Sequence, residues 1–224
     1  MVDARLRFLG RGHYAPTERA LADVVAAATA PGIVLDVGSG PGTYLAHALD
    51  AADGRPVAAS GADRPARLGV ALDLSAVAIR RAARAHERAG AVVGDVTERL
   101  PVVDGAAAVV LDVFAPRNQH EYARVLHPDG VLVVVTPRTG HLAELAEATI
   151  TVDPEKERRL HDSLTPAFAP RSAEDLTWTM ELSAEDVHDV VHMGPSHHHV
   201  VADTVFAPAT VTAAVTVSTW TPVH

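Results

Sequence analysis

Short apolar runs alternate with segments of helical periodicity between residues 17 and 135. The runs are rich in valine, leucine and alanine, which is typical of parallel strands buried on both faces. They lie at 33–37, 68–72, 91–93, 107–113 and 131–135. The intervening segments carry apolar residues three or four positions apart and predict helices at 17–28, 44–51, 75–89 and 119–126. This order predicts βαβ units and a doubly wound α/β fold.

The pattern changes in the C-terminal part of the chain. Proline opens a predicted helix at 154–164, and another is predicted at 183–191. Alternating segments at 176–182 and 211–220 predict two strands that extend the sheet antiparallel at one edge. Pro128-Asp129-Gly130 predicts a turn. We expect one domain over 1–224, with an N-terminal helical segment at 1–30, a cofactor-binding core at 31–148 and a C-terminal part at 149–224.

The composition narrows the class of protein. Hydrophobic residues make up 48% of the chain, yet no apolar run approaches the roughly 20 residues of a membrane-spanning helix. The N-terminus lacks the pattern of a secretory signal, so we expect a cytoplasmic protein without a membrane partner. The absence of cysteine excludes disulfides and thiolate metal sites, and no metal site is expected. The formal net charge of −9 argues against RNA binding by the chain alone.

A glycine-rich loop follows the first predicted strand. Its sequence is Asp36-Val37-Gly38-Ser39-Gly40-Pro41-Gly42-Thr43-Tyr44. Ligands of a doubly wound sheet bind beyond the carboxyl ends of the strands, and glycines let the backbone approach a ligand where a Cβ would clash. Dinucleotide sites usually have the spacing G-x-G-x-x-G. Here the spacing is G-x-G-x-G, and Asp36 suits the cationic amino-acid part of S-adenosylmethionine better than a pyrophosphate.

Two further acidic residues stand at the ends of the next strands. Asp73, followed by Leu74, ends the second strand, and Asp95, followed by Val96, comes after the third. Asp73 is placed to accept both ribose hydroxyls and Asp95 the adenine amino group, although each alone would be more typical of a helix cap or a turn. Together with the glycine loop they indicate S-adenosylmethionine as cofactor, S-adenosylhomocysteine as product and the Rossmann-like class I methyltransferase fold.

Several motifs are more specific than the fold. They are G-H-Y-x-P at 12–16, F-A-P at 114–116 and H-L-x-E-L at 141–145, with further matching segments at 34–38, 71–75, 136–140, 152–157 and 193–196. Over nearly its whole length the chain resembles the 23S ribosomal RNA guanine-N1 methyltransferases, the family that includes enzymes of tylosin resistance. The resemblance implies that Tyr14, Gly42, Thr43 and His141 line the cofactor pocket. Tyr14 would close over it from the N-terminal helix, and His141 would approach from the fifth strand.

The chain also departs from that family. Family members carry an N-terminal zinc-binding module, whereas this chain has no cysteine, so either the protein lacks the module or the module precedes Met1. The small-acidic pair that the family has inside the glycine loop is Ser39 and Pro41 here. His197-His198-His199 replaces a usual aromatic residue, and three adjacent histidines favour a surface or pocket-rim role over a metal site.

The acceptor of the methyl group stays open at the sequence level. Asp112 ends the fourth strand and is a candidate general base for guanine N1 or a group that holds an ammonium-bearing substrate, with capping of the turn at 116–118 as an equal alternative. One hypothesis is methylation of a guanine in 23S rRNA. A second is a repurposed enzyme of natural-product biosynthesis that N-methylates a small molecule or closes a ring, and a third is a cofactor-binding scaffold. A homodimer or a partner protein is also compatible with the sequence.

Overall fold

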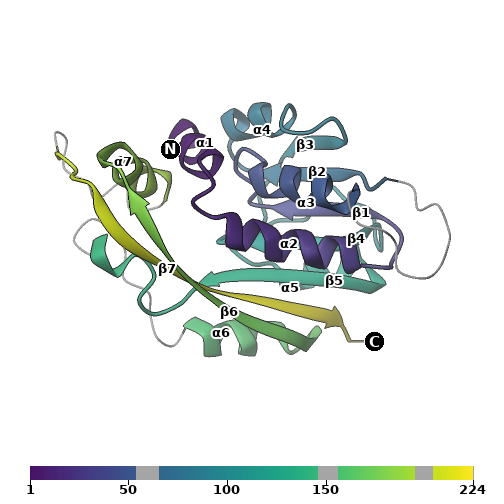
Figure 1. Cartoon of the computed structure of the whole chain (residues 1–224). Coiled ribbons are helices and arrows are strands. Elements are labelled where there is room, and N and C mark those ends of the chain that lie inside the picture. Colours follow the sequence, from purple (N-terminus) through teal and green to yellow (C-terminus); the bar gives the residue numbers. More distant parts are fainter. Residues whose placement is uncertain (54–65, 146–155, 195–203, 224) are drawn as a thin grey trace.

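The computed structural model describes residues 1–53, 66–145, 156–194 and 204–223 (Figure 1). Its helices are α1 (Val2–Gly10), α2 (Ala15–Ala27), α3 (Thr43–Asp53), α4 (Ala76–Ala82), α5 (Gln119–Val125), α6 (Lys156–Leu164), α7 (Ala184–Met193) and the short 3-10 helix η1 (Ala143–Leu145). Its strands are β1 (Ile33–Val37), β2 (Gly69–Asp73), β3 (Ala89–Val93), β4 (Ala107–Val113), β5 (Leu126–Pro137), β6 (Phe168–Leu182) and β7 (Ala209–Pro222).

These strands form one sheet of order β3-β2-β1-β4-β5-β7-β6. Strands β1 to β5 pair in parallel, and β7 is antiparallel to both β5 and β6. The predicted doubly wound sheet and the two late strands are therefore confirmed. Only β7 runs against the other strands, because pairing antiparallel to β7 gives β6 the direction of β5.

Side chains on both faces of the central strands are buried. Along β4, Val109 and Leu111 join one core and Val110 joins the other. The first core contains side chains of α1, α2, α3 and α7, and the second contains side chains of α5 and α6. Figure 1 shows α2 and α3 in front of the sheet. This burial on two sides explains why the strands read as continuous apolar runs.

Some predicted boundaries are wrong. The helix expected over 75–89 begins as predicted, with the Oγ of Ser75 accepting a hydrogen bond from the backbone N–H of Ala78 at 3.3 Å, but it ends at Ala82. Ala89 belongs to β3 and is paired with Gly69 of β2. The alanine-rich segment favours a helix by propensity, and strand pairing in the sheet overrides it. Residues 128–130, predicted as a turn, lie within β5 at an irregularity in its pairing with β4.

The outer strand β6 is longer than predicted. It begins at Phe168, and residues 169–175 are exposed on both of its faces. A shift of register between Pro170 and Ser172 interrupts its pairing with β7. Periodicity could not reveal this half of the strand because neither of its faces is buried. No helix within the described ranges is long and apolar enough to cross a membrane.

Candidate cofactor site

The glycine-rich loop connects β1 to α3, as predicted. Gly38, Gly40 and Gly42 have φ angles of 65°, 56° and 81°, in the left-handed region that glycine favours. A Cβ built on Gly38 would lie 2.6 Å from the Cβ of Ala115, and one on Gly40 would lie 2.7 Å from Nη1 of Arg5. Backbone conformation therefore favours glycine at all three positions, and close packing against Ala115 adds to that requirement at Gly38. Thr43, the first residue of α3, is half-buried beside the loop.

Asp36 lies in β1 immediately before this loop, and only 1% of its surface is exposed. Its Oδ2 is buried and has no hydrogen-bond partner among the described residues. Burial raises the pKa of Asp36 to about 8; the positive charge of Arg5 opposes that rise, and the carboxylates of Asp112 and Asp73 add to it. A buried carboxylate without a donor is costly, so this position is suited to a cationic ligand.

Asp73 ends β2 and joins the glycine loop to the start of α4. Its Oδ2 accepts a hydrogen bond from the backbone N–H of Gly40 at 2.8 Å, and its Oδ1 accepts one from the N–H of Ser75 at 2.8 Å. Each carboxylate oxygen has a second lone pair, so these bonds leave acceptor capacity for ligand hydroxyls. Leu74, which follows, is 70% exposed.

Asp95, after β3, holds a local turn. Its Oδ1 accepts hydrogen bonds from both the backbone N–H and the hydroxyl of Thr97, at 2.8 and 2.7 Å, and these bonds lower the pKa of Asp95. The adjacent Val96 is buried in the core that contains α5. The turn role is the alternative that the sequence offered for Asp95, and the adenine role stays a prediction.

Tyr14 and His141 meet although they are far apart in the sequence. The Tyr14 hydroxyl lies 3.2 Å from Nε2 of His141, and Nδ1 of His141 accepts the backbone N–H of Ala214 at 3.1 Å. Since Nδ1 accepts, the neutral ring carries its proton on Nε2 and donates it to the Tyr14 oxygen. Tyr14 is buried, and edge-on contacts join its ring to Phe114 and Trp178, with ring centroids 6.2 and 5.4 Å away.

Asp112 lies in β4 beside the end of β1, in register with Val37, and is fully buried. Its Oδ2 accepts a hydrogen bond from the hydroxyl of Tyr122 at 3.0 Å, and its Oδ1 accepts one from the N–H of Ala115 at 3.4 Å. Burial and the neighbouring carboxylate of Asp112 both raise the pKa of Tyr122. These bonds support the turn-capping alternative for Asp112, while its role as general base stays a prediction.

The sequence pattern does not predict two features of the site, which involve helix α1 and Trp178. Residues 1–30 were predicted as a helical segment with one helix at 17–28, and α1 was not distinguished as a separate helix, although Ala4 and Phe8 are buried at helical spacing. Helix α1 brings Arg5 against the glycine loop. Trp178 was assigned only to a strand, yet its indole N–H donates to the carbonyl of His13 at 2.8 Å. The stretch His197-His198-His199 lies outside the described residues.

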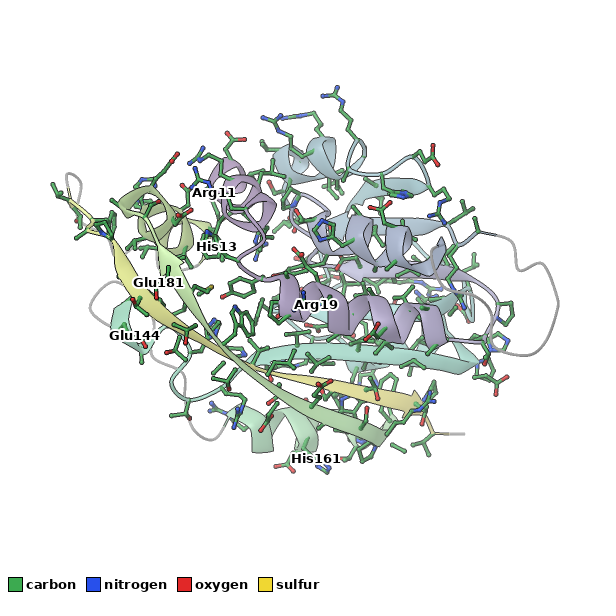
Figure 2. All side chains as sticks on the ribbon, viewed as in Figure 1. Arg11, His13, Arg19, Glu144, His161 and Glu181 are labelled. Carbon is green, nitrogen blue, oxygen red and sulfur yellow. The ribbon has the colours of Figure 1, made fainter. Side chains whose placement is uncertain are left out.

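Helix α1 is attached to α7 by ion pairs. Arg7 donates from Nε and Nη2 to the two carboxylate oxygens of Asp189, at 2.8 and 2.6 Å. Arg11 donates to Asp186 at 2.5 Å and to Glu185 at 2.6 Å. Figure 2 shows Arg11 on the side of α1 nearest to α7. These contacts span more than 170 positions of sequence and fix α1 over the site.

The comparisons with solved structures agree with this architecture. A methyltransferase of Haloferax volcanii, solved in complex with a methyltransferase activator, has a TM-score of 0.63 and 17% identity, covering 99% of this chain and 95% of its own. A methyltransferase of Bacillus halodurans has a TM-score of 0.56 and 18% identity, covering 90% and 97%. At such identities the likeness shows the fold, which is that of class I methyltransferases. No protein-family model matches the chain.

Curated relatives are much more similar in sequence. A 23S rRNA (guanine(748)-N(1))-methyltransferase of Streptomyces fradiae is 44% identical over 204 residues, which cover 89% of this chain and 69% of the relative. A protein of Micromonospora griseorubida, named as a 23S rRNA (guanine-N(1)-)-methyltransferase, is 41% identical over the whole chain and 80% of its own length. The chain is therefore an S-adenosylmethionine-dependent methyltransferase. It belongs to the family of 23S rRNA (guanine-N1)-methyltransferases.

Proposed function

We propose that the protein transfers the methyl group of S-adenosylmethionine to N1 of a guanine in 23S rRNA. The observation that carries this proposal is the identity of 41–44% with relatives named for that reaction, over 89–100% of the chain. No observation on the described residues favours the small-molecule alternative. The proposal gives the acidic residues of the site a common purpose, because each would bind one part of the cofactor.

The residues around the glycine loop suit the cofactor part by part. Asp36 lacks a hydrogen-bond donor for its buried Oδ2 and would take the ammonium group. Asp73, next to the backbone of Gly40, would accept the ribose hydroxyls with its remaining lone pairs. Asp95 would accept the adenine amino group. The left-handed φ angles at Gly38, Gly40 and Gly42 shape the loop, and at Gly38 a Cβ would also clash with Ala115.

The reaction needs positioning and the removal of one proton. The cofactor supplies a methyl group already activated by its sulfonium, so in-line alignment of guanine N1 provides most of the acceleration. The N1–CH3 bond forms as the S–CH3 bond breaks, and the N1 proton passes to a base. Phe114 and Trp178 are half-buried around Tyr14 and offer aromatic faces on which a base can stack.

Methyl transfer to RNA tests this function directly. The protein is incubated with tritium-labelled S-adenosylmethionine and 23S rRNA, and the RNA is then read by primer extension, which stops at N1-methylguanine because the methyl group blocks base pairing. We expect label in the RNA and one stop at a guanine. Asp36→Asn should strongly reduce both at low cofactor concentration, whereas Arg81→Met, on the exposed face of α4, should change neither. Binding of S-adenosylhomocysteine without any labelled RNA would refute the acceptor and leave the cofactor site standing.

We also propose a cytoplasmic location and assembly as a homodimer or with a partner protein. Light scattering of the purified protein gives its mass and tests the homodimer, co-purification from cells tests the partner protein, and cell fractionation tests the location. The solved complex of the Haloferax volcanii methyltransferase with an activator is a precedent within the same fold.

A further inference from the structure

One guanidinium faces the cofactor site without a partner. Arg5, on α1, is half-buried, and its Nη1 lies 2.7 Å from the position that a Cβ on Gly40 would occupy. Within the described part of the chain its side chain forms no hydrogen bond or ion pair. Burial raises the pKa of Asp36, Tyr14 and Tyr44, and the charge of Arg5 opposes the rise at all three. Arg5 thus acts on the groups that surround the loop.

The next arginines of the same segment behave differently. Arg7 binds both oxygens of Asp189, and Arg11 binds Asp186 and Glu185. These pairs attach the N-terminal segment to α7. Arg5 is on the same short helix, yet its guanidinium is directed at the loop instead of at an acid of α7. Within the described residues, the hydrogen-bonding groups of Arg5 are therefore available beside the loop.

We propose that Arg5 binds the α-carboxylate of the cofactor's amino-acid part, opposite Asp36, which takes the ammonium. The inference rests on the proposed cofactor site. The amino-acid part carries both charges on one carbon, and the site offers one group of each opposite sign beside the same loop. A guanidinium presents paired N–H donors that match a carboxylate, which a lysine would not reproduce. Gly40 then has a second purpose, because a side chain there would displace the guanidinium.

Two ligands that differ only in the carboxylate test this assignment. S-adenosylhomocysteine carries it, and the decarboxylated analogue 5′-(3-aminopropylthio)-5′-deoxyadenosine keeps the ammonium and lacks it. Calorimetric titration measures both affinities for the wild-type protein and for Arg5→Met, Arg5→Gln and Arg5→Lys. We expect Arg5→Met to weaken the binding of S-adenosylhomocysteine by about 10- to 100-fold and the binding of the analogue by less than about threefold. The affinity of Arg5→Gln for S-adenosylhomocysteine should be similar to that of Arg5→Met. The affinity of Arg5→Lys should lie between these two variants and the wild type.

The controls separate this inference from the site itself. Arg81→Met removes an exposed arginine that is paired with Asp3, and it should leave both affinities unchanged. Because Arg5 has no partner to lose, thermal unfolding of its variants should match the wild type, which excludes misfolding. If the Arg5 variants weaken the binding of both ligands equally, or of neither ligand, the proposed role of Arg5 is wrong. Failure of the wild-type protein to bind S-adenosylhomocysteine would overturn the cofactor site and, with it, this inference.

Discussion

The hydroxyl of Tyr14 and Nε2 of His141 lie 3.2 Å apart, although the two residues are separated by 127 positions. The backbone N–H of Ala214, in the antiparallel strand β7, fixes the ring from its other side. One imidazole thus connects the N-terminal helices to the strand that completes the sheet. The contact lies among aromatic rings, and the family resemblance predicts that both residues line the cofactor pocket.

The contact between Tyr14 and His141 should contribute to the free energy of unfolding. Tyr14→Phe removes one hydrogen bond and should lower the free energy of unfolding by about 1 kcal/mol. His141→Ala also leaves the N–H of Ala214 without its acceptor and should cost about 2–3 kcal/mol. Urea denaturation of both single variants and the double variant gives the coupling energy. Additive effects would show that the 3.2 Å contact contributes nothing.

Cofactor affinity should depend on pH through Asp36. The pKa of this carboxyl in the free protein is about 8, so at pH 7 it is mostly protonated, and binding of an ammonium group requires its proton to leave. Affinity should therefore rise with pH up to about 8, where the α-amino group of the cofactor begins to lose its own proton. Calorimetry in buffers of different ionisation enthalpy should detect proton release at pH 7. Asp36→Asn should bind weakly and without that release; a flat pH profile in the wild type would contradict the assignment.

The pairing of α1 with α7 should stabilise the fold at neutral pH. Arg7→Met leaves the buried carboxylate of Asp189 without its main partner and should lower the free energy of unfolding, although solvent screens the pair because the Arg7 side chain is 45% exposed. Burial alone would raise the pKa of Asp189, but its bonds to Arg7 and His188 outweigh burial and lower it.

The sign of its pH dependence follows from that lowered pKa. The stabilisation is complete above the ordinary aspartate pKa of 3.8 and is lost as the pH falls through the lower value of the folded protein. The difference in unfolding free energy between the wild type and Arg7→Met should therefore shrink below about pH 4. Arg81→Met, at an exposed pair, provides the control. A difference that stays constant down to pH 3 would contradict the pairing.

Substitutions at Asp112 and at its hydrogen-bond partner Tyr122 can distinguish turn capping from general-base catalysis by Asp112. If Asp112 caps the turn, Asp112→Asn should lower the free energy of unfolding by about 1–3 kcal/mol, and Tyr122→Phe should cost about 1 kcal/mol. We expect this outcome, because both oxygens of Asp112 already accept hydrogen bonds. A loss of methyl transfer above about 100-fold in Asp112→Asn, with stability and cofactor affinity unchanged, would establish the general base instead.

The sequence predicted what depends on local pattern. The apolar runs around Asp36 and Asp112 located the central strands because both of their faces are buried, and the glycine spacing located the loop. What it did not predict depends on distant pairing. Arg5 reaches the loop from α1, a helix whose ion pairs with α7 span more than 170 positions. Similarly, the local sequence does not show that Ala89 belongs to a strand, because that depends on its pairing with Gly69 of β2.

The outer strand β6 also determines how the sheet ends. A free strand edge offers unpaired backbone groups to any other strand, including that of a second molecule. Along its exposed half, β6 carries Arg171, Glu174 and Asp175, and Pro170 lacks a backbone donor at the point where the register shifts. Charge, proline and irregularity are the features by which natural sheets resist edge-to-edge aggregation. These features disfavour pairing along this edge, and replacing Arg171, Glu174 and Asp175 with valine or threonine should favour self-association there.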